Sequence, residues 1–361
     1  MKRKTAALYN PYLDTLGGGE KHILSILKVL ESRGYQISIF WDHDLRKETA
    51  NRLNVSFQNI TFLPNIFSKK HSIIEKLKAL KSFDLFFYIP DGSYFFSSAR
   101  RNYIFAMVPT KTILPHRLLD FIKIWNYKWI ANSPFTKKWF SEQHIQTDVI
   151  TPCIEDDFVS TDILTIEKEP IILSVGRFFK HLHGKKQHIA IDAFRNIKKN
   201  NPLLHNFKLI LAGGLKNEDQ AYFAELQSYT KQDPSICFKP NISFQELLSL
   251  YRKATFYWHF TGYGVDEKNH PEQVEHMGIT PLEAMAMGCL TFCYRAGGPT
   301  YFIKEGINGF LFSSIEELST KTITIMNSEH NRIITQNAHM YVKEHFGYNA
   351  FKNTVRDTLH I

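Results

Sequence analysis

Two glutamates with seven residues between them stand in segment 275–288, which reads EHMGITPLEAMAMG. Thr280 suits the N-cap of a helix, Pro281 suits its first position, and Glu283 falls at the third. The N-terminus of a helix exposes N–H groups and carries roughly half a positive charge, so it can bind a phosphate or a polar sugar. Glu275 before that terminus and Glu283 inside it have the chemistry to hold sugar hydroxyls on either side of the anion.

A purely structural alternative exists for the same residues. Thr280 and Glu283 have the spacing of a capping box, in which the glutamate bonds back to the N-cap backbone. In that case neither residue needs a ligand. The segment alone leaves both interpretations open, and the rest of the chain has to decide between them.

A glycine run follows the first expected strand and leads into a helix. Gly17, Gly18 and Gly19 would let the backbone approach a ligand closely, and the helix end after them would favour an anion. A simple turn is the alternative, since a single glycine-rich turn is a weak signal.

Two basic residues occupy a similar position in the second half of the chain. Gly176 and Arg177 end an expected strand, and Lys185 precedes an expected helix at residues 187–198. Arginine can hold a diphosphate with two parallel hydrogen bonds and lysine can hold it as a point charge. Surface charge is the alternative, but the carboxyl edge of a parallel sheet is where such folds bind ligands.

Strands and helices alternate regularly in both halves of the chain, the strands apolar and the helices amphipathic. These elements would position the residues named above. Continuous apolar strands between helices predict a parallel sheet covered on both faces. The expected strands are residues 5–9, 36–41, 85–89, 103–108, 129–131 and 149–151, then 171–175, 208–212, 236–238, 255–259, 290–294 and 309–312. The pattern predicts an α/β fold of two doubly wound domains facing across a cleft, with the polar segment 155–170 as a linker.

Length and composition agree with a two-domain globular protein. A chain of 361 residues with 43% hydrophobic and 22% charged residues exceeds one ordinary core. No apolar run approaches the length of a membrane span, and Pro11 and Asp14 interrupt the basic N-terminus, so we expect no secretory signal. The cysteines lack zinc-ligand spacing and are expected to be reduced thiols of a cytosolic protein: Cys153, Cys237, Cys289 and Cys293.

The basic excess lies entirely in the first half. Residues 1–150 carry 22 Lys and Arg against 12 Asp and Glu (22 − 12 = +10), whereas residues 151–361 carry 22 against 23 (22 − 23 = −1). An anionic membrane surface, nucleic acid and a solvated face are the possible explanations. No nucleic-acid module is present, and segment 68–81 spaces Ile73, Leu77 and Leu80 as on a lysine-rich amphipathic helix. A surface helix packed on a sheet explains that segment equally well.

Taken together, the motifs resemble family-4 glycosyltransferases over nearly the whole chain. They are Gly17-Gly-Gly-Glu20, Val175-Gly-Arg177, Lys185-Lys-Gln, Leu211-Ala-Gly-Gly214 and Glu275-x7-Glu283-Ala-Met-Ala-x-Gly288, with Gly297-Gly298-Pro after them. The resemblance implies a retaining enzyme of the GT-B architecture with two Rossmann-like domains. Residues 1–157 would form the acceptor domain, residues 158–340 the nucleotide-sugar donor domain, and a helix in residues 341–361 would cross back to the first.

The resemblance also implies roles for individual residues. Arg177 and Lys185, next to Gly176, would neutralise the donor's diphosphate, and Glu275 would hold hydroxyls of the transferred sugar. The remaining donor-binding residues would be Gly278, Ile279 and Thr280 through their backbone N–H groups, Glu283 through the ribose, and Gly18 and Gly19 through the phosphates. The implied donor is a nucleotide diphosphate sugar, with a UDP-sugar expected in preference to a GDP-sugar, and neither a cofactor nor a metal is implied.

Some positions depart from the family pattern. Relatives often carry a histidine in the first domain where this chain has Met107, and His116 is a possible substitute. The loop 178–184, with His181 and His183, is longer than the common form, so Lys186 is a rival of Lys185. The insert 262–276 is expected to line the site. Asp42-His-Asp44 matches a metal motif of another transferase fold, but a metal role there is not favoured.

The sequence thus predicts a cytoplasmic transferase, which the membrane interpretation of its basic half would place peripherally on the inner face of the membrane. It would move a hexose-type sugar to a glycan, lipid-linked or polysaccharide acceptor and would bind no nucleic acid. Two alternatives stay open: a non-catalytic, nucleotide-sugar-binding subunit of a glycan assembly complex, and another GT-B enzyme such as a nucleotide-sugar epimerase.

Overall fold

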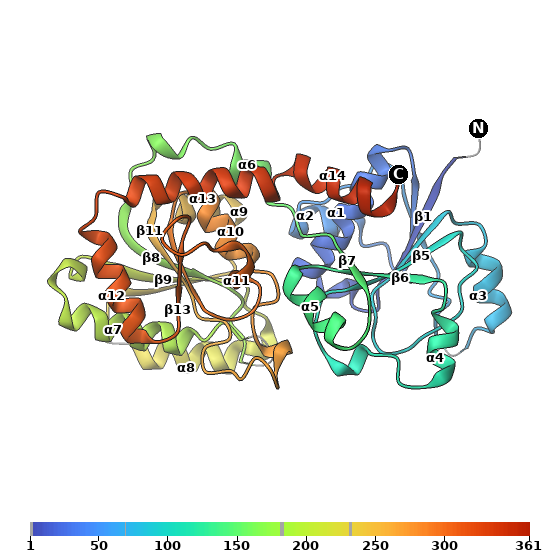
Figure 1. The fold of residues 1–361 in the computed structure, drawn as a ribbon, viewed down its shortest axis with the longest axis horizontal. Helices are drawn as coiled ribbons and strands as arrows, with labels where there is room; N and C mark the ends of the chain where they lie inside the picture. The colour runs from blue at the N-terminus through green and yellow to red at the C-terminus, as the bar shows by residue number, and fades with distance from the viewer. Residues whose placement is uncertain (1–2, 69, 181–183, 231–232) are drawn as a thin grey trace. The chain divides into compact units, whose positions relative to one another are not determined.

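A computed structural model describes residues 3–68, 70–180, 184–230 and 233–361. The chain divides into two compact units, each built on its own parallel sheet (Figure 1). Unit 1 comprises Met1–Pro152 and Phe351–Ile361, and unit 2 comprises Cys153–Ala350. Among the described residues, no helix combines the length and apolar character needed to cross a bilayer.

Unit 1 holds a seven-stranded sheet in the order β3-β2-β1-β4-β5-β6-β7, in which every pairing is parallel. Its strands are β1 (Thr5–Tyr9), β2 (Gln36–Phe40), β3 (Ile60–Leu63), β4 (Leu85–Tyr88), β5 (Arg101–Ala106), β6 (Tyr127–Ala131) and β7 (Thr147–Val149). The edge strand β3 was not expected from the sequence. It has only four residues and is half exposed, so it lacks the continuous apolar run of the central strands.

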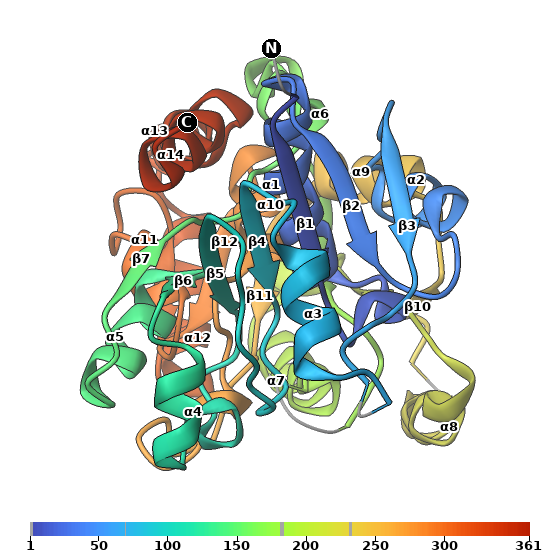
Figure 2. The ribbon, with the colours of Figure 1, turned by 90° about the vertical axis from the view of Figure 1, so that its right-hand side faces the viewer.

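Helices cover both faces of this sheet, as Figure 2 shows from the side of unit 1. They are α1 (Gly18–Ser32), α2 (Arg46–Leu53), α3 (Ile73–Leu80), α4 (Leu118–Lys123), α5 (Pro134–Glu142) and α14 (Tyr348–Leu359). Leu80 and Phe140 bring α3 and α5 onto one face, where they join a core with Phe86. The ring of His22 on α1 contacts Phe105 on the opposite face.

Unit 2 holds a six-stranded parallel sheet in the order β10-β9-β8-β11-β12-β13. Its strands are β8 (Glu169–Val175), β9 (Lys208–Gly213), β10 (Ile236–Pro240), β11 (Ala254–His259), β12 (Leu290–Tyr294) and β13 (Phe310–Phe312). Successive side chains of β8 enter two different cores, since Ile171 and Leu173 lie in one and Ile172 in the other. The central strands are therefore buried on both faces, as their continuous apolar sequence predicts.

The helices of unit 2 are α6 (Asp156–Val159), α7 (Gln187–Asn200), α8 (Gln220–Thr230), α9 (Phe244–Lys253), α10 (Ile279–Ala286), α11 (Pro299–Phe302), α12 (Ile315–Met326) and α13 (Asn331–Phe346). The segment expected as a linker, 155–170, packs within unit 2 instead, because Phe158 and Val159 on α6 are buried in its core.

The C-terminal region consists of two helices rather than one. Helix α13 ends at Phe346 and α14 begins at Tyr348, with Gly347 between them in an extended conformation. Within unit 1, Phe351 and Leu359 of α14 are buried, and the Arg101 guanidinium donates to the carbonyl of Leu359.

Candidate functional site

The carboxylate of Glu275 is the centre of a largely buried polar cluster in unit 2. Its Oε2 atom accepts from Lys185 Nζ at 2.6 Å and from His259 Nε2 at 2.9 Å. The side chains of Lys185 and Glu275 are 15% and 13% exposed, and that of His259 is 2% exposed. Since a carboxylate can only accept, the contact assigns a proton to Nε2 of His259.

The cluster fixes the charge of its members. Burial alone would raise the pKa of Glu275, but Lys185 and His259 outweigh that effect and hold the pKa well below its ordinary value. Burial lowers the pKa of His259, against the opposing pull of Glu275. At neutral pH the cluster is therefore a lysine–glutamate ion pair with a neutral imidazole beside it.

The described residues engage one oxygen of the Glu275 carboxylate through hydrogen bonds. Within the described part of the chain, both hydrogen bonds to Glu275 fall on Oε2 and none falls on Oε1. An ionised, oriented carboxylate oxygen of this kind is a strong acceptor for a sugar hydroxyl.

Lys185 reaches this cluster from the segment before α7, and Gly176 at the end of β8 lies directly beneath its aliphatic chain. Lys186, the alternative position for the phosphate-binding lysine, has a φ of 53° and forms the N-cap of α7. The geometry thus brings Lys185, and not Lys186, to Glu275. The nearby His181 and His183 lie outside the described residues.

Arg177 follows Gly176 but is directed elsewhere. Its guanidinium lies 3.7 Å from Asp219 Oδ2 and 3.8 Å from Glu218 Oε1, and it stacks at 4.5 Å over the Phe179 ring. In the described residues no hydrogen bond or ion pair joins Arg177 to Lys185 or Glu275, and its side chain stays 36% exposed. The ion pairs are long, so an anion of higher charge density can compete for this guanidinium.

Helix α10 begins earlier than the sequence predicts. Gly278 is its N-cap, with a φ of 96°, and Ile279 is its first residue. Thr280 is therefore inside the first turn, and the prediction that it caps the helix is wrong. The left-handed conformation at Gly278 ends the preceding segment, and the Thr280 hydroxyl accepts from Tyr257 Oη at 2.8 Å instead of capping.

Glu283 consequently lies beyond the third helical position, and no side-chain hydrogen bond caps α10. Its Oε2 accepts from Tyr251 Oη at 2.8 Å. Tyr251 is fully buried on α9, so the phenol anchors a half-buried carboxylate on α10. The capping-box interpretation of Thr280 and Glu283 does not hold.

The backbone of Glu275 is also fixed. Gly298 N donates to Glu275 O at 2.7 Å, and a Cβ on Gly297 would lie 2.0 Å from that oxygen. Gly297 N in turn donates to Glu267 Oε2 at 2.6 Å, which ties the insert 262–276 to this turn. The glycine pair after β12 thereby sets the position of Glu275.

The two glycines predicted to bind phosphates in unit 1 open α1. The helix starts at Gly18, within the glycine run, and Gly17 N donates to Glu20 Oε2 at 2.9 Å. A Cβ on Gly19 would lie 2.9 Å from Met107 Sδ. Met107, where a histidine was expected from the family pattern, therefore packs against the glycine turn, whereas His116 is exposed elsewhere.

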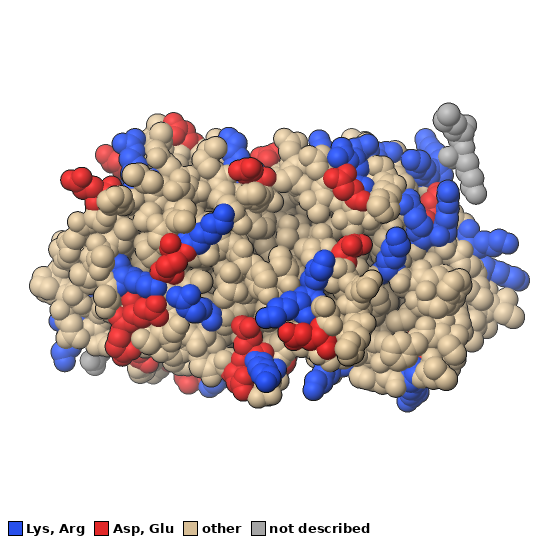
Figure 3. All heavy atoms as spheres, in the orientation of Figure 1, with Lys and Arg blue, Asp and Glu red and all other residues tan. Residues whose placement is uncertain are grey.

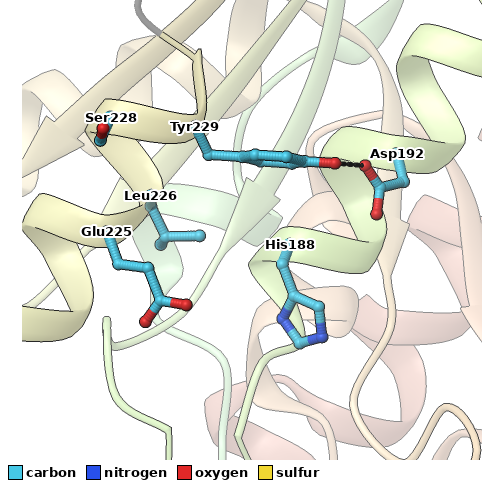
Figure 4. A pocket seen from close by; sticks show the side chains of 6 residues that line it. All are labelled: His188, Asp192, Glu225, Leu226, Ser228 and Tyr229. Carbon is cyan, nitrogen blue, oxygen red and sulfur yellow. Dashed lines mark hydrogen bonds between the residues drawn. The ribbon is translucent and has the colours of Figure 1, made fainter.

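A separate hollow of about 680 Å³ lies along α7 and α8 and contains none of the predicted site residues (Figure 4). It is lined by His188, Asp192, Glu225, Leu226, Ser228 and Tyr229. The Tyr229 hydroxyl already donates to Asp192 across it. The hollow belongs to the helical layer, and we assign it no ligand.

His259 was not recognised from the sequence. The available signal was its place after the apolar run of β11, because β11 pairs with β8 and both strands end at the same edge of the sheet.

A family model described as "Glycosyl transferases group 1" matches residues 157–341. The mouse protein named GDP-Man:Man(3)GlcNAc(2)-PP-Dol alpha-1,2-mannosyltransferase is 30% identical over 210 residues, covering 54% of this chain and 40% of that protein. The chain thus spans about two fifths of the length of such curated relatives.

Solved structures share the fold at low identity. A Rickettsia africae glycosyltransferase superimposes with a TM-score of 0.73 at 17% identity, covering 100% of this chain and 98% of that one. Anabaena Alr3699/HepE in complex with UDP gives a TM-score of 0.72 at 17% identity, with 99% of both chains covered. The two-domain α/β architecture expected from the sequence is confirmed by these likenesses.

Proposed function

The chain belongs to the glycosyl transferases of group 1, and we propose that it transfers a hexose-type sugar from a nucleotide diphosphate sugar to a saccharide acceptor. The observation that carries this proposal is the buried cluster in which Lys185 and His259 orient Glu275. A protein that only supported a partner would have no need of an ionised, oriented carboxylate there.

The geometry of unit 2 and the family resemblance support the following roles. Glu275 Oε1 would accept from a hydroxyl of the transferred sugar, and Lys185 would place its charge beside the departing diphosphate. Arg177 would exchange its long acidic contacts for a phosphate oxygen. Gly278, Ile279 and Thr280 would offer backbone N–H groups, and Glu283 would bind the ribose; Gly18 and Gly19 remain a prediction from the family resemblance.

We propose a retaining, metal-independent reaction. The anomeric carbon gains positive charge as the nucleoside diphosphate leaves, and fixed cations around the leaving phosphate stabilise that state. The C–O bond to the phosphate breaks while the acceptor oxygen bonds to the same face of the sugar. The leaving phosphate oxygen takes the acceptor's proton, so no protein nucleophile is required.

Two further features of the reaction are the nucleobase of the donor and the class of the acceptor. The expected preference for UDP over GDP gains no support, since one relative is named for GDP-Man and one structural neighbour holds UDP. We propose a glycan, lipid-linked or polysaccharide acceptor. A lipid-linked acceptor would place the enzyme at the cytoplasmic face of a membrane, where the basic residues of unit 1 would meet anionic lipid.

Thermal unfolding with UDP, GDP, ADP, TDP and CMP tests the proposal. A nucleotide at about 100 times its dissociation constant should stabilise the protein by roughly 2.7 kcal/mol. We expect stabilisation by one diphosphate, its reduction in Lys185→Met, and its persistence in the matched control Lys186→Met. Hydrolysis of the corresponding nucleotide sugar should then be lost in Glu275→Ala.

Stabilisation without hydrolysis or transfer would favour the non-catalytic subunit, and release of an epimerised nucleotide sugar would favour the epimerase. Absence of stabilisation by every nucleotide would reject the donor site itself.

A further inference from the structure

Segment 118–125 of unit 1 exposes an unusual set of apolar side chains. No residue of α4 is buried, although four of its six residues are large and apolar. The exposed fractions are 79% for Leu118, 52% for Leu119, 52% for Phe121, 48% for Ile122 and 78% for Trp125. Soluble monomers rarely leave such residues contiguous in solvent unless the surface binds something.

The segment is held firmly in this exposed position. Ile113 before it and Ile124 within it are buried in the core of unit 1, together with Tyr127. Asn126 Nδ2 donates to Ser97 O at 3.0 Å. The apolar side chains thus project from an anchored helix and not from a loose loop.

Basic residues flank the apolar ones along the chain. Residues 111–128 include Lys111, Arg117, Lys123 and Lys128. Their single acid is Asp120, whose side chain is 16% exposed and lies 3.6 Å from Lys123 Nζ. Within residues 111–128, basic residues therefore outnumber acidic ones by four to one.

The neighbouring helix α3 adds to the same surface. Burial lowers the pKa of Lys76 on α3, Glu75 opposes that shift, and the charge of Lys123 on α4 adds to it. Ile73 and Ile74 of α3 are 58% and 64% exposed. Figure 2 shows α3 and α4 on the near side of unit 1. Figure 3, in the orientation of Figure 1, shows mostly uncharged surface on this unit with lysine, arginine and some acidic side chains around it.

We propose that residues 118–125 insert into the headgroup region of an anionic lipid bilayer. Leucine, phenylalanine and tryptophan side chains would enter the acyl boundary, while Lys76, Arg117 and Lys123 would contact lipid phosphates. A second copy of the chain is a poorer occupant, because self-association would oppose two basic rims. A six-residue helix is also short for filling a protein groove.

This inference names the residues of the proposed membrane contact and would stand even if the chain transferred no sugar. It is tested on full-length protein with vesicles of phosphatidylcholine, with and without phosphatidylglycerol. We expect sedimentation with the anionic vesicles at low salt and release at high salt, because screening weakens the attraction. The triple variant Leu118→Ser, Phe121→Ser, Trp125→Ser should bind at least about tenfold more weakly.

Two controls make the result specific. Leu203→Ser with Ile333→Ser removes exposed apolar side chains of unit 2, 48% and 54% exposed, and should leave vesicle binding unchanged. Trp125→Phe should retain binding but remove most of the blue shift of tryptophan emission, because Trp129, Trp139 and Trp258 are buried and the half-buried Trp41 lies outside residues 118–125.

Equal binding by the triple variant would overturn the proposal, as would failure of the wild type to bind anionic vesicles at low salt. A wild-type dimer that becomes a monomer in the triple variant, without vesicle binding, would assign the surface to a second copy. Nucleotide stabilisation, measured on the same samples, should be unchanged in the triple variant. Its absence from every sample would instead count against the donor site.

Discussion

Gly176 leaves open the space that the aliphatic chain of Lys185 occupies. A Cβ on Gly176 would lie 2.4 Å from Lys185 Cγ and 2.9 Å from its Cδ, distances that two non-bonded carbons do not adopt. The lysine crosses this glycine on its way to Glu275. The glycine at the end of β8 is thus a packing requirement of the ion pair.

Gly176→Ala should therefore displace Lys185 from Glu275. We expect the unfolding free energy to fall by about 1–3 kcal/mol. The apparent affinity for the stabilising nucleotide should fall at least about tenfold. The matched control is Gly214→Ala, whose Cβ would meet only Arg177 Cγ at an ordinary 3.7 Å. Calorimetry with and without nucleotide measures both effects. Equal behaviour of the two variants would contradict the packing argument.

Lys185→Met should strongly destabilise the protein, because it leaves the carboxylate of Glu275 buried beside a neutral His259. Breaking one side of a buried pair costs about 3–5 kcal/mol. Glu275→Gln in the Lys185→Met background should recover part of that loss, because it removes the unpaired charge. Denaturant unfolding of the two single variants and the double variant gives the coupling energy.

The exposed pair of Lys180 and Glu225 is the control for this cycle. Its atoms lie 3.3 Å apart, but both side chains are more than 60% exposed. Lys180→Met should change the unfolding free energy by no more than about 1 kcal/mol. If the coupling energy between Lys185 and Glu275 were also no more than about 1 kcal/mol, burial would not strengthen this ion pair.

His259 should act as a positioning residue for Glu275. His259→Gln can still donate an N–H to the carboxylate, whereas His259→Phe keeps the volume and removes the donor. We expect donor hydrolysis to fall about tenfold in the phenylalanine variant and much less in the glutamine variant. Equal losses, or an effect on folding alone, would mean that the imidazole only fills space.

Sequence reasoning was effective where one residue or one repeating pattern determines the structure. The alternation of apolar strands with amphipathic helices yielded both sheets, and only the short, half-exposed edge strand β3 escaped it. The strand end at Gly176 and the family motifs that contain Lys185 and Glu275 also indicated residues of one site, and contacts join these three residues in the structure.

Tertiary contacts explain what the sequence could not predict. Thr280 has good capping chemistry, but Tyr257 of strand β11 donates to its hydroxyl, and Gly278 ends the preceding turn. His259 acquires its role only because β11 lies beside β8. The apolar residues of α4 are of the same types as core residues, so only their exposure in the structure distinguishes them from a core.

His22 makes the stability of unit 1 sensitive to acid. Burial lowers its pKa to about 3 from an ordinary 6.5, against a weaker opposing hydrogen bond with the backbone of Thr151. Its Nε2 is buried and, among the described residues, has no hydrogen-bond partner. The folded chain therefore keeps a neutral imidazole where the unfolded chain takes up a proton, so stability is present above pH 6.5 and is lost as the pH falls toward 3.

Between pH 7.5 and 5.5 this single group should reduce the unfolding free energy by about 1.4 kcal/mol. His22→Asn retains a side-chain N–H for the Thr151 backbone but cannot be protonated. Between pH 7.5 and 5.5 its unfolding free energy should therefore fall by about 1.4 kcal/mol less than that of the wild type. The exposed His116→Asn serves as the control and should follow the wild type. Denaturant titrations at the two pH values give, for each protein, the change in unfolding free energy between pH 7.5 and 5.5. A constant destabilisation by the asparagine cancels in this change. An equal change in unfolding free energy for wild type and His22→Asn would show that His22 is not the group that titrates.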